Sequence, residues 1–321
     1  MAGGCRVGVV YGDEVLLYSF PEPHPFRSDR VENFYRRLPE LEAELPEQIV
    51  RVPPRRASEE EVLLYHDREY VEFVKKQCEE GYGYLDYGDT PAFRGCYKAS
   101  LYVVGSTLRL VEMVLKGEIE HGFNPVGGLH HARRSKAAGF CIFNDAGTAI
   151  QYLLDKAGLN TILYVDIDAH HGDGVFYDFY YDKRVIIVDF HQDGRTLYPG
   201  TGFSYERGGG EAEGTKLNIP LMPGAGTREL IEAWESMVEG FIEKFSPEFV
   251  LIQAGADGMQ GDPLTGLEYT EEVHRYVVSK LHRYAEEKCE GRIVAMGGGG
   301  YNRANIVKAW SEVVRALATP P

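Results

Sequence analysis

The stretch that decides the fold is residues 160–174, "NTILYVDIDAHHGDG", where an apolar run ends in charged residues. Its first part, residues 160–168, is almost continuously apolar, which is typical of a strand covered on both faces in a parallel sheet. Its second part gathers three aspartates and two histidines within residues 164–174. So many ionisable groups directly behind a buried strand predict a functional site at the end of that strand.

Other apolar runs indicate further strands of the same sheet, at residues 5–11, 184–191, 248–257 and 292–301. Segments with helical spacing lie between them, at residues 58–77, 91–117, 144–158, 227–245 and 270–289. This alternation predicts an α/β fold: one domain over residues 1–321, with an open, mostly parallel sheet flanked by helices. Such sheets bind their ligands beyond the carboxyl ends of the strands. The proline-rich piece at residues 51–56, "RVPPRR", reads as a surface connection.

Charge and composition narrow the classes of partner. The 321 residues carry a formal net charge of −15, with a sequence pI near 5.2. This argues against nucleic-acid binding, which relies on clustered lysine and arginine. An acidic surface favours cationic partners such as lysine-rich tails or polyamines, although it also simply promotes solubility.

The cysteines and the apolar runs indicate a cytoplasmic protein. The five cysteines are scattered and contain no CxxC pair, so we expect reduced thiols and no disulfide framework. No apolar segment follows a basic start at the N-terminus, and no run reaches the length of a membrane span. We therefore expect neither a signal peptide nor contact with a membrane.

The end of the central strand has the residue types of a metal site. Asp166, Asp168 and His170 share one face of an extended chain, and Asp257 ends another strand. Carboxylates aimed together repel unless a cation lies between them. An Asp–His–Asp set leaves one open position on a tetrahedral metal, as in catalytic zinc sites. The alternative is a cluster whose members are bonded only to helix N-termini and backbone amides.

A second cluster supplies groups for acid–base chemistry. His130 and His131 are adjacent within "GGLHHARRSKAAGFCIFND", residues 127–145. Asp166 and Asp173 are available as their partners, and a His–Asp pair fixes the tautomer and raises the basicity that a general base requires.

A glycine-rich turn follows the last expected strand, "GGGGYN" at residues 297–302. It is not a dinucleotide-binding fingerprint, because it does not open a helix after the first strand. The four glycines let the backbone approach another group closely, and Tyr301 then presents a hydroxyl group.

In these motifs the chain resembles the zinc-dependent histone deacetylases of the arginase/deacetylase superfamily, in their prokaryotic acetoin-utilisation and deacetylase-like branch. The resemblance runs from "HPFRSDR" at residue 24 to "GGGGYNRAN" at residue 305, and includes "YVDIDAHHGDGV", "YPGTG" and "QAGADGMQGDPL". It implies the arginase/deacetylase fold and removal of acetyl or other short acyl groups from lysine side chains.

The resemblance also implies a role for each matching position. The zinc ligands are Asp168, His170 and Asp257, and the catalytic groups are His130, His131, Asp166, Asp173 and Tyr301. The substrate-binding positions are Asp89 and Leu264 at the rim, Gly139, Phe140 and Tyr198 in the tunnel walls, and Gly299. Arg30 matches an arginine behind the active site.

Potassium ions are a further implication of the resemblance. One would lie beside the zinc, at Asp166, Asp168, His170, Asp189 and Phe190, and a second near Phe179, Asp182 and Val185. The chain departs from many relatives at three positions. Asp189 replaces serine, Tyr198 replaces phenylalanine, and Leu264 replaces the glutamate of some polyamine-selective relatives.

Three other functions compete with hydrolysis of acetyl-lysine in proteins or peptides. An amidohydrolase of acetylated polyamines uses the same chemistry, although the missing glutamate at Leu264 favours protein lysine. A dinuclear manganese ureohydrolase needs a second paired-aspartate motif, and Met259 stands two residues after Asp257. A non-catalytic acyl-lysine-binding module would not need Tyr301. The sequence leaves the oligomeric state, the acyl length and the metal used in the cell open.

Overall fold

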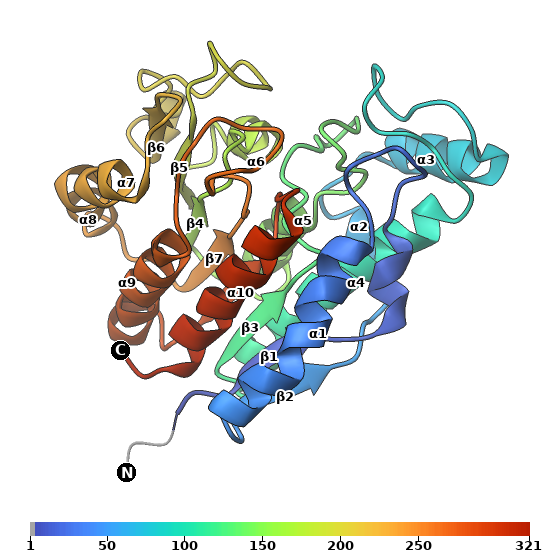
Figure 1. Ribbon diagram of the computed structural model, residues 1–321. Coiled ribbons are helices and arrows are strands. Elements are labelled where there is room, and N and C mark those ends of the chain that lie inside the picture. Colours follow the sequence, from blue (N-terminus) through green and yellow to red (C-terminus); the bar gives the residue numbers. More distant parts are fainter. Residues whose placement is uncertain (1–3) are drawn as a thin grey trace.

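A computed structural model describes residues 4–321 and contains one eight-stranded sheet in which every pairing is parallel (Figure 1). The strands follow one another across the sheet in the order β2-β1-β3-β8-β7-β4-β5-β6. Their bounds are β1 Val7–Val10, β2 Ile49–Val52, β3 His121–Asn124, β4 Ile162–Asp166, β5 Val185–Gln192, β6 Lys216–Leu221, β7 Phe249–Gln253 and β8 Ile293–Met296. The expected parallel α/β fold is confirmed.

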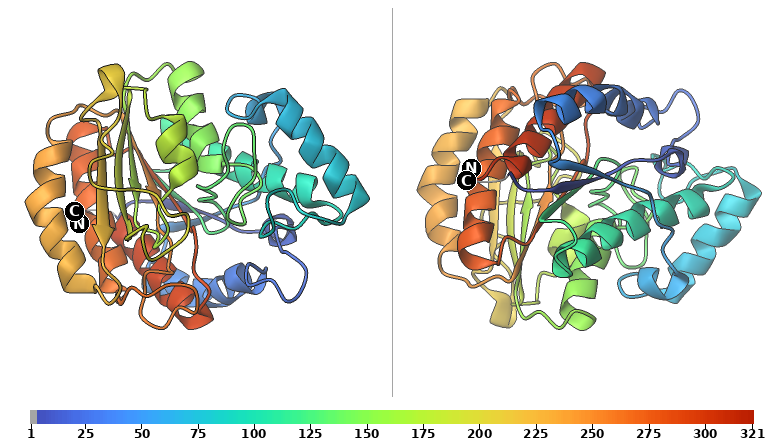
Figure 2. Two further views of the ribbon diagram at one scale, coloured as in Figure 1. Left: turned by 90° about the horizontal axis from the view of Figure 1, so that it is seen from above. Right: turned by 90° about the horizontal axis from the view of Figure 1, so that it is seen from below.

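Helices cover both faces of the sheet (Figure 2). One layer contains α1 Asp29–Glu44, α7 Thr227–Ala233, α8 Glu239–Ile242, α9 Glu272–Lys288 and α10 Arg303–Ala318. The other contains α2 Glu59–Val62, α3 Arg68–Glu80, α4 Cys96–Leu115, α5 Asp145–Asp155 and α6 Asp173–Asp178. A π-helical turn, Trp234–Val238, joins α7 to α8, and two short 3₁₀ turns lie at Asp13–Leu17 and Gly210–Ala212. Both faces of the sheet are therefore buried, as the continuous apolar runs predict.

Three strands and several helices were not expected. The strand β2 lies at one edge of the sheet. Its last two residues, 51 and 52, are the first two of the segment interpreted as a surface connection, so that interpretation was wrong for them. The strands β3 and β6 contain glycine or proline and few β-branched residues, which weakens their signal. The expected helix at 58–77 is two helices, because α2 ends after one capped turn and α3 starts at Arg68. The helices α1, α6 and α10 were missed.

The cysteines are the clearest correction. Cys78 on α3 and Cys96 on α4 form a disulfide, with their Cα atoms 5.5 Å apart, whereas the sequence analysis expected only reduced thiols. Eighteen residues separate the two positions, so no short spacing motif marks them. The packing of α3 on α4 brings them together, and Cys5, Cys141 and Cys289 remain free.

Both ends of the described chain lie at the amino edge of the sheet. The backbone N–H of Cys5, just before β1, donates to the carbonyl oxygen of Ala318 at the end of α10. Within residues 4–321, no helix has the length and apolar character needed to cross a membrane.

The strand order determines where the chemistry collects. The neighbouring strands β3, β8, β7 and β4 lie in the middle of the sheet, and the polar motifs follow their carboxyl ends. These motifs come from distant parts of the sequence, and parallel pairing brings them to one edge.

Candidate active site

The predicted metal ligands converge at this edge. Asp168 and His170 follow β4, and Asp257 follows β7. The Nδ1 atom of His170 lies 3.1 Å from Oδ1 of Asp168 and 2.9 Å from Oδ2 of Asp257. One candidate ligand atom from each residue lies within 4.8 Å of the others, and both carboxylates are buried. The three side chains can thus hold one metal ion between them.

In each carboxylate, the oxygen that does not face His170 is held by hydrogen bonds. Oδ2 of Asp168 accepts hydrogen bonds from Nε2 of Gln253 at 2.7 Å and from the backbone N–H of Gly299 at 2.8 Å. Oδ1 of Asp257 accepts from the backbone N–H of Ala169 at 2.8 Å. Among residues 4–321, no lysine or arginine forms an ion pair with either carboxylate. Burial, and then the neighbouring charge of Asp168, raise the pKa of Asp257 to about 7. A cation between the two carboxylates would offset their repulsion.

The histidine pair lies beside this cluster, and each ring faces its expected carboxylate. Nδ1 of His130 lies 2.8 Å from Oδ2 of Asp166, and Nδ1 of His131 lies 2.6 Å from Oδ1 of Asp173. The two Nε2 atoms are 3.1 Å apart, so one proton can be shared between the rings. Each ring thus keeps its Nδ1 on a carboxylate and turns its Nε2 toward the other ring.

The two rings differ in their affinity for a proton. Burial disfavours a charged ring at His130, but the carboxylates of Asp166 and Asp168 outweigh it and raise the pKa of His130 to about 10. Burial and the charge of His130 lower the pKa of His131 to about 4. At neutral pH, His131 is therefore the ring that is free to accept a proton.

The loop that carries the histidines is tied to the start of α5. The carboxylate of Asp145 accepts from the backbone N–H groups of Gly128 and Leu129, at distances of 2.9–3.1 Å. Asn144 caps α5 through the N–H of Gly147, and its amide nitrogen donates to the carbonyl of His130. Asn144 and Asp145, at the end of the motif, thus hold the loop that carries His130 and His131.

Tyr301 enters from the other side of the cluster. Arg30, fully buried on α1, donates to the carbonyl oxygens of Gly298 and Gly300 at 2.6 Å each, and so braces the glycine-rich turn. Asp262 accepts from the backbone N–H of Tyr301 at 2.7 Å. Burial raises the pKa of the Tyr301 phenol well above its ordinary value, so the hydroxyl stays protonated and can donate.

A hollow of about 260 Å³ leads to these groups. It is lined by Asp89, His131, Gly139, Phe140, His170, Leu197, Tyr198, Leu264 and Tyr301. All predicted tunnel and rim positions except Gly299 are among them, and Leu197 is an addition. Catalytic groups and substrate-contacting positions therefore share one narrow opening.

Phe140 forms a rigid wall of this hollow. Its φ is 69°, in the left-handed region that residues other than glycine rarely adopt. Its N–H donates to Oγ1 of Thr90, and its carbonyl accepts from the hydroxyl of Tyr18 at 2.7 Å. Its ring packs edge-to-face on Tyr301, with centroids 5.9 Å apart. The strained backbone holds the ring against Tyr301, in the wall of the hollow.

The comparisons with known proteins agree with this geometry. The family model described as the histone deacetylase domain matches residues 24–317. The chain belongs to the histone deacetylase family. It is 38% identical over 312 residues to the acetoin utilization protein AcuC of Bacillus subtilis (strain 168). The aligned region covers 95% of this chain and 80% of that protein. AcuC of Staphylococcus aureus (strain MSSA476) is 34% identical over 327 residues, covering 98% and 82%.

A solved structure extends the likeness to three dimensions. The crystal structure of the HDA15 HD domain superposes with a TM-score of 0.88 at 30% identity, covering 98% of this chain and 89% of that one. The resemblance to histone deacetylases and the arginase/deacetylase fold are thus confirmed. Family membership makes the chain a deacetylase of the hydrolase class.

Two residues near the histone deacetylase motifs have contacts that the sequence did not specify. Gly299 borders an adjoining cavity of about 20 Å³, which shares His131, His170 and Tyr301 with the hollow, and supports Asp168 through its N–H. Its assignment as a substrate contact remains a prediction. Gln253 was given no role, although it holds Asp168 and lies 3.4 Å from Nδ1 of His130. A polar residue ending the apolar strand β7 was the available signal.

The first predicted potassium position remains a prediction. Asp166 and Asp189 are neighbours across β4 and β5, and both are buried. Asp189 accepts from the backbone N–H of Gly172 and pairs with Nδ1 of His191 at 2.7 Å. The aspartate that replaces serine is therefore matched by a histidine. Phe190 follows it in the core of β5.

The second predicted potassium position also remains a prediction, although a lysine side chain lies at two of its three residues. Nζ of Lys216, a fully buried residue at the start of β6, donates to the carbonyls of Asp182 at 3.0 Å and Val185 at 2.6 Å. It also donates to Oγ1 of Thr215, whose hydroxyl in turn donates to Ala212. Three acceptors match the three hydrogens of an ammonium group. The amine of Lys216 thus binds the carbonyls of Asp182 and Val185, two of the three residues predicted to hold a second potassium ion.

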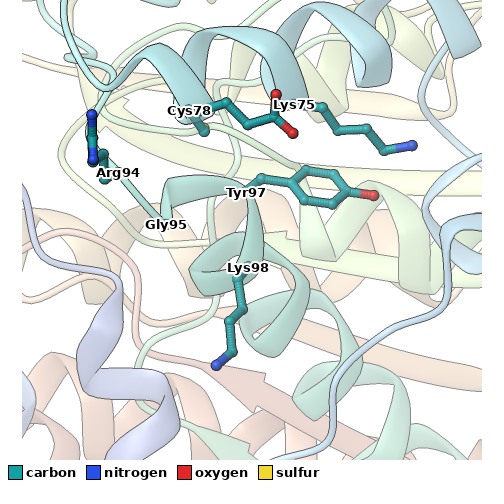
Figure 3. Close-up of a pocket in the computed structure, with 7 residues that line it drawn as sticks. Lys75, Cys78, Arg94, Gly95, Tyr97 and Lys98 are labelled. Carbon is teal, nitrogen blue, oxygen red and sulfur yellow. The ribbon is translucent and has the colours of Figure 1, made fainter.

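A separate hollow lies between α3 and α4 (Figure 3). It has a volume of about 390 Å³ and is bordered by Lys75, Cys78, Arg94, Tyr97 and Lys98, among others. Lys75 is ion-paired with Glu59 and Glu72 on the same side of the molecule. The lining contains no histidine or aspartate, so this hollow offers no base or metal-ligand set comparable with the central edge.

Proposed function

We propose that this histone deacetylase relative is a zinc-dependent hydrolase that removes acetyl groups from lysine side chains. The observation that carries the proposal is the hollow that ends on His131, His170 and Tyr301. A base, a metal ligand and a hydroxyl donor meet at the bottom of one opening with apolar walls. An extended side chain bearing a terminal amide suits such a site.

The donor set fits zinc. Two buried carboxylates and one imidazole face each other without a lysine or arginine partner in residues 4–321. Three protein ligands leave the fourth tetrahedral position open, as catalysis requires. When bound, zinc would polarise the acyl oxygen and lower the pKa of water toward about 7.

Proton transfer falls to the histidine pair. His131 accepts the proton of the attacking water and later returns it to the leaving lysine amine, and Asp173 orients its ring. His130, paired with Asp166, keeps its positive charge and stabilises the negative charge that develops nearby. His131 thus transfers the proton, and His130 supplies the positive charge.

Tyr301 acts on the acyl oxygen. Its protonated hydroxyl has no other hydrogen-bond partner in the described chain and borders the hollow. It can donate to the oxygen as negative charge develops, a contact that strengthens in the transition state.

The tunnel walls favour an alkyl chain. Phe140 and Tyr198 flank the opening, and the Tyr198 ring lies 5.1 Å from that of His131. Leu264 is 38% exposed at the rim, where a glutamate would attract a second amine of a polyamine. Asp89 at the opening suits the backbone N–H groups of a peptide substrate. These features support lysine in a protein or peptide over a free polyamine.

The test is a comparison of kcat/KM on acetyl-lysine peptides, longer acyl-lysine peptides and acetylated polyamines, with bound zinc quantified. We expect the acetyl-lysine peptides to give the highest values. Higher values for acetylpolyamines would move the substrate to that class. A zinc-loaded protein that binds acetyl-lysine peptide without turnover would support the binding-module alternative.

A further inference from the structure

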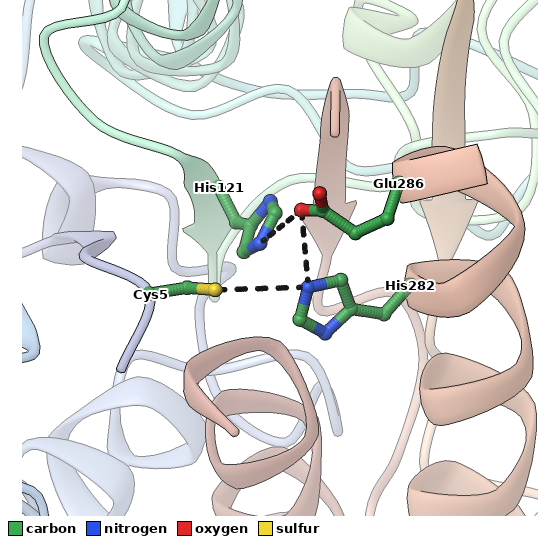
Figure 4. A group of neighbouring side chains, drawn as sticks. All are labelled: Cys5, His121, His282 and Glu286. Carbon is green, nitrogen blue, oxygen red and sulfur yellow. Dashed lines mark hydrogen bonds and ion pairs between the residues drawn. The ribbon is translucent and has the colours of Figure 1, made fainter. Parts of the chain in front are cut away.

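A second group of metal-binding side chains lies at the amino edge of the sheet, away from the active site. Cys5 precedes β1, His121 begins β3, and His282 and Glu286 lie one turn apart on α9. One candidate ligand atom from each lies within 4.8 Å of the other three. Figure 4 shows the four side chains pointing toward a common centre. The strand β3, the helix α9 and the N-terminal segment thus contribute to one cluster.

The separations match a tetrahedral site. Sγ of Cys5 lies 3.8 Å from Nε2 of His282, and Oε1 of Glu286 lies 3.6 Å from that nitrogen and 3.9 Å from Nε2 of His121. A tetrahedral zinc with bonds of about 2.0–2.3 Å holds its ligand atoms about 3.3–3.7 Å apart. Small side-chain rotations would close the difference.

The histidines are prepared to bind a metal. Nδ1 of His282 donates to the carbonyl of Ala316 at 3.0 Å, which leaves the lone pair of Nε2 facing the cluster. His121 is fully buried, and neither of its ring nitrogens has a hydrogen-bond partner in residues 4–321. A buried imidazole without partners is rare unless an ion or water binds it.

Glu286 and Cys5 supply the other two candidate ligand atoms. Glu286 has no lysine or arginine partner in the described chain, and its side chain is 43% exposed, so an ion can reach the cluster from solvent. Burial raises the pKa of the Cys5 thiol, and a bound metal would displace that proton. One thiolate, two imidazoles and one carboxylate form a closed set of four donors, all of types that bind zinc, and four is the ligand number of a structural zinc site.

We propose that Cys5, His121, His282 and Glu286 form a second, structural site for zinc. The ion would join the segment before β1 to β3 and α9. Cys5 and His282 also bond to the end of α10, at Ala318 and Ala316. The site would therefore hold both ends of the chain against the sheet, without contact with the active site.

Cobalt distinguishes the two sites, because only the second contains sulfur. The metal-free protein is titrated with Co²⁺ under reducing conditions, and we expect two bound ions per chain. One of them should produce the near-ultraviolet charge-transfer band of a cobalt thiolate. The variant Cys5→Ser should lose this band and one equivalent of metal, whereas Cys289→Ser, which removes a free cysteine outside the cluster, should retain both.

A second pair of variants avoids dependence on cysteine. Glu286→Gln should weaken binding at this site by about 10- to 100-fold, a loss comparable to that of other metal-site changes. Glu287→Gln, which alters the exposed next residue on α9, should leave binding unchanged. Both should retain the turnover of the unmodified protein. The proposal is overturned if the wild type binds a single Co²⁺ without a thiolate band, or if the band survives in Cys5→Ser.

Discussion

Two edges of one sheet carry two differently built groups of metal-binding side chains. At the carboxyl edge, three candidate ligands lie beneath a hollow that reaches solvent: the buried Asp168 and Asp257 and the partly exposed His170. At the amino edge, four side chains surround their own centre, and the hollow above the active site does not extend to them. Three ligands below an opening leave a position for substrate, whereas four ligands close the coordination shell. Ligand number and access separate the proposed catalytic function from the proposed structural one.

The surroundings of the two groups differ in the same way. At the carboxyl edge, Asp168 and Asp257 are each fixed by backbone N–H groups, so ligand geometry is set before any ion binds. At the amino edge, His121 has no partner within residues 4–321, and Glu286 is half exposed. The first group is pre-organised for chemistry, and the second would be ordered by its ion.

The largest expected effect is at Asp257. Replacing it with asparagine removes a charged ligand of the open site, and we expect kcat/KM to fall by about 1,000-fold or more, since metal activation is worth several kcal/mol. Bound zinc should fall from two ions to one per chain. Glu286→Gln is the matched carboxylate-to-amide change at the other edge, and its kcat/KM should stay within about twofold of wild type.

Paired measurements of zinc content and kcat/KM for Asp257→Asn and Glu286→Gln check this contrast. Full activity in Asp257→Asn would break the assignment of the carboxyl edge. A loss of turnover in Glu286→Gln, with its fold intact, would instead show that the two edges are coupled.

Tyr301→Phe should have the next largest effect. It removes one oxygen and keeps the ring that packs on Phe140, so the fold and both metal sites should remain. Loss of one donor to the developing oxyanion should lower kcat by about 100- to 1,000-fold. Substrate affinity should change much less, because Phe140 and Tyr198 still line the hollow.

Single-turnover hydrolysis and direct binding of an acetyl-lysine peptide separate these two quantities. If affinity fell and the rate of the bound complex did not, Tyr301 would be a binding residue. Retention of the wild-type rate would remove its hydroxyl from the mechanism.

The catalytic edge was largely predictable from sequence because its motifs are continuous. "DIDAH" follows an expected strand, "GGLHH" places two histidines side by side in one loop, and the parallel sheet brings the two motifs together. Gln253 was missed because a single amide in an apolar strand has no spacing to mark it. The contact of the Gly299 N–H with Asp168 was not predicted, because sequence cannot show where a backbone N–H points.

The amino edge could not be predicted in this way. Cys5, His121 and His282 are isolated residues in three separate segments, and only Glu286 stands at a helical spacing from one of them. The disulfide between Cys78 and Cys96 was missed for the same reason, since packing of α3 on α4 creates it. Local patterns identify a site built from one or two segments, whereas a site built from single residues of many segments requires the fold.

The smallest expected effect is at Lys216, a third charged group, which lies at the amino end of β6. Its side chain brings a positive charge to the residues predicted to hold a second potassium ion. Its ammonium group satisfies the carbonyls of Asp182 and Val185. Lys216→Ala should leave these oxygens without a donor and lower the free energy of unfolding by about 1–3 kcal/mol. Lys183→Ala, which removes an exposed lysine next to Asp182, is the control. Turnover of both variants should stay within about twofold of wild type, because neither side chain touches the hollow.

The response to potassium decides whether the lysine replaces an ion. Burial lowers the pKa of Lys216 to about 7, with Asp182 opposing the shift, so the comparison is made below pH 7, where the amine is charged. Thermal unfolding is followed in potassium chloride and in tetramethylammonium chloride of equal ionic strength. Potassium should raise the Tm of Lys216→Ala more than that of the wild type or Lys183→Ala, because the emptied carbonyl cage can accept the ion. Any effect of the predicted potassium position near Asp189 is common to all three proteins and cancels. Equal shifts in all three would mean that Lys216 is an ordinary buried lysine whose carbonyl partners do not form a potassium site.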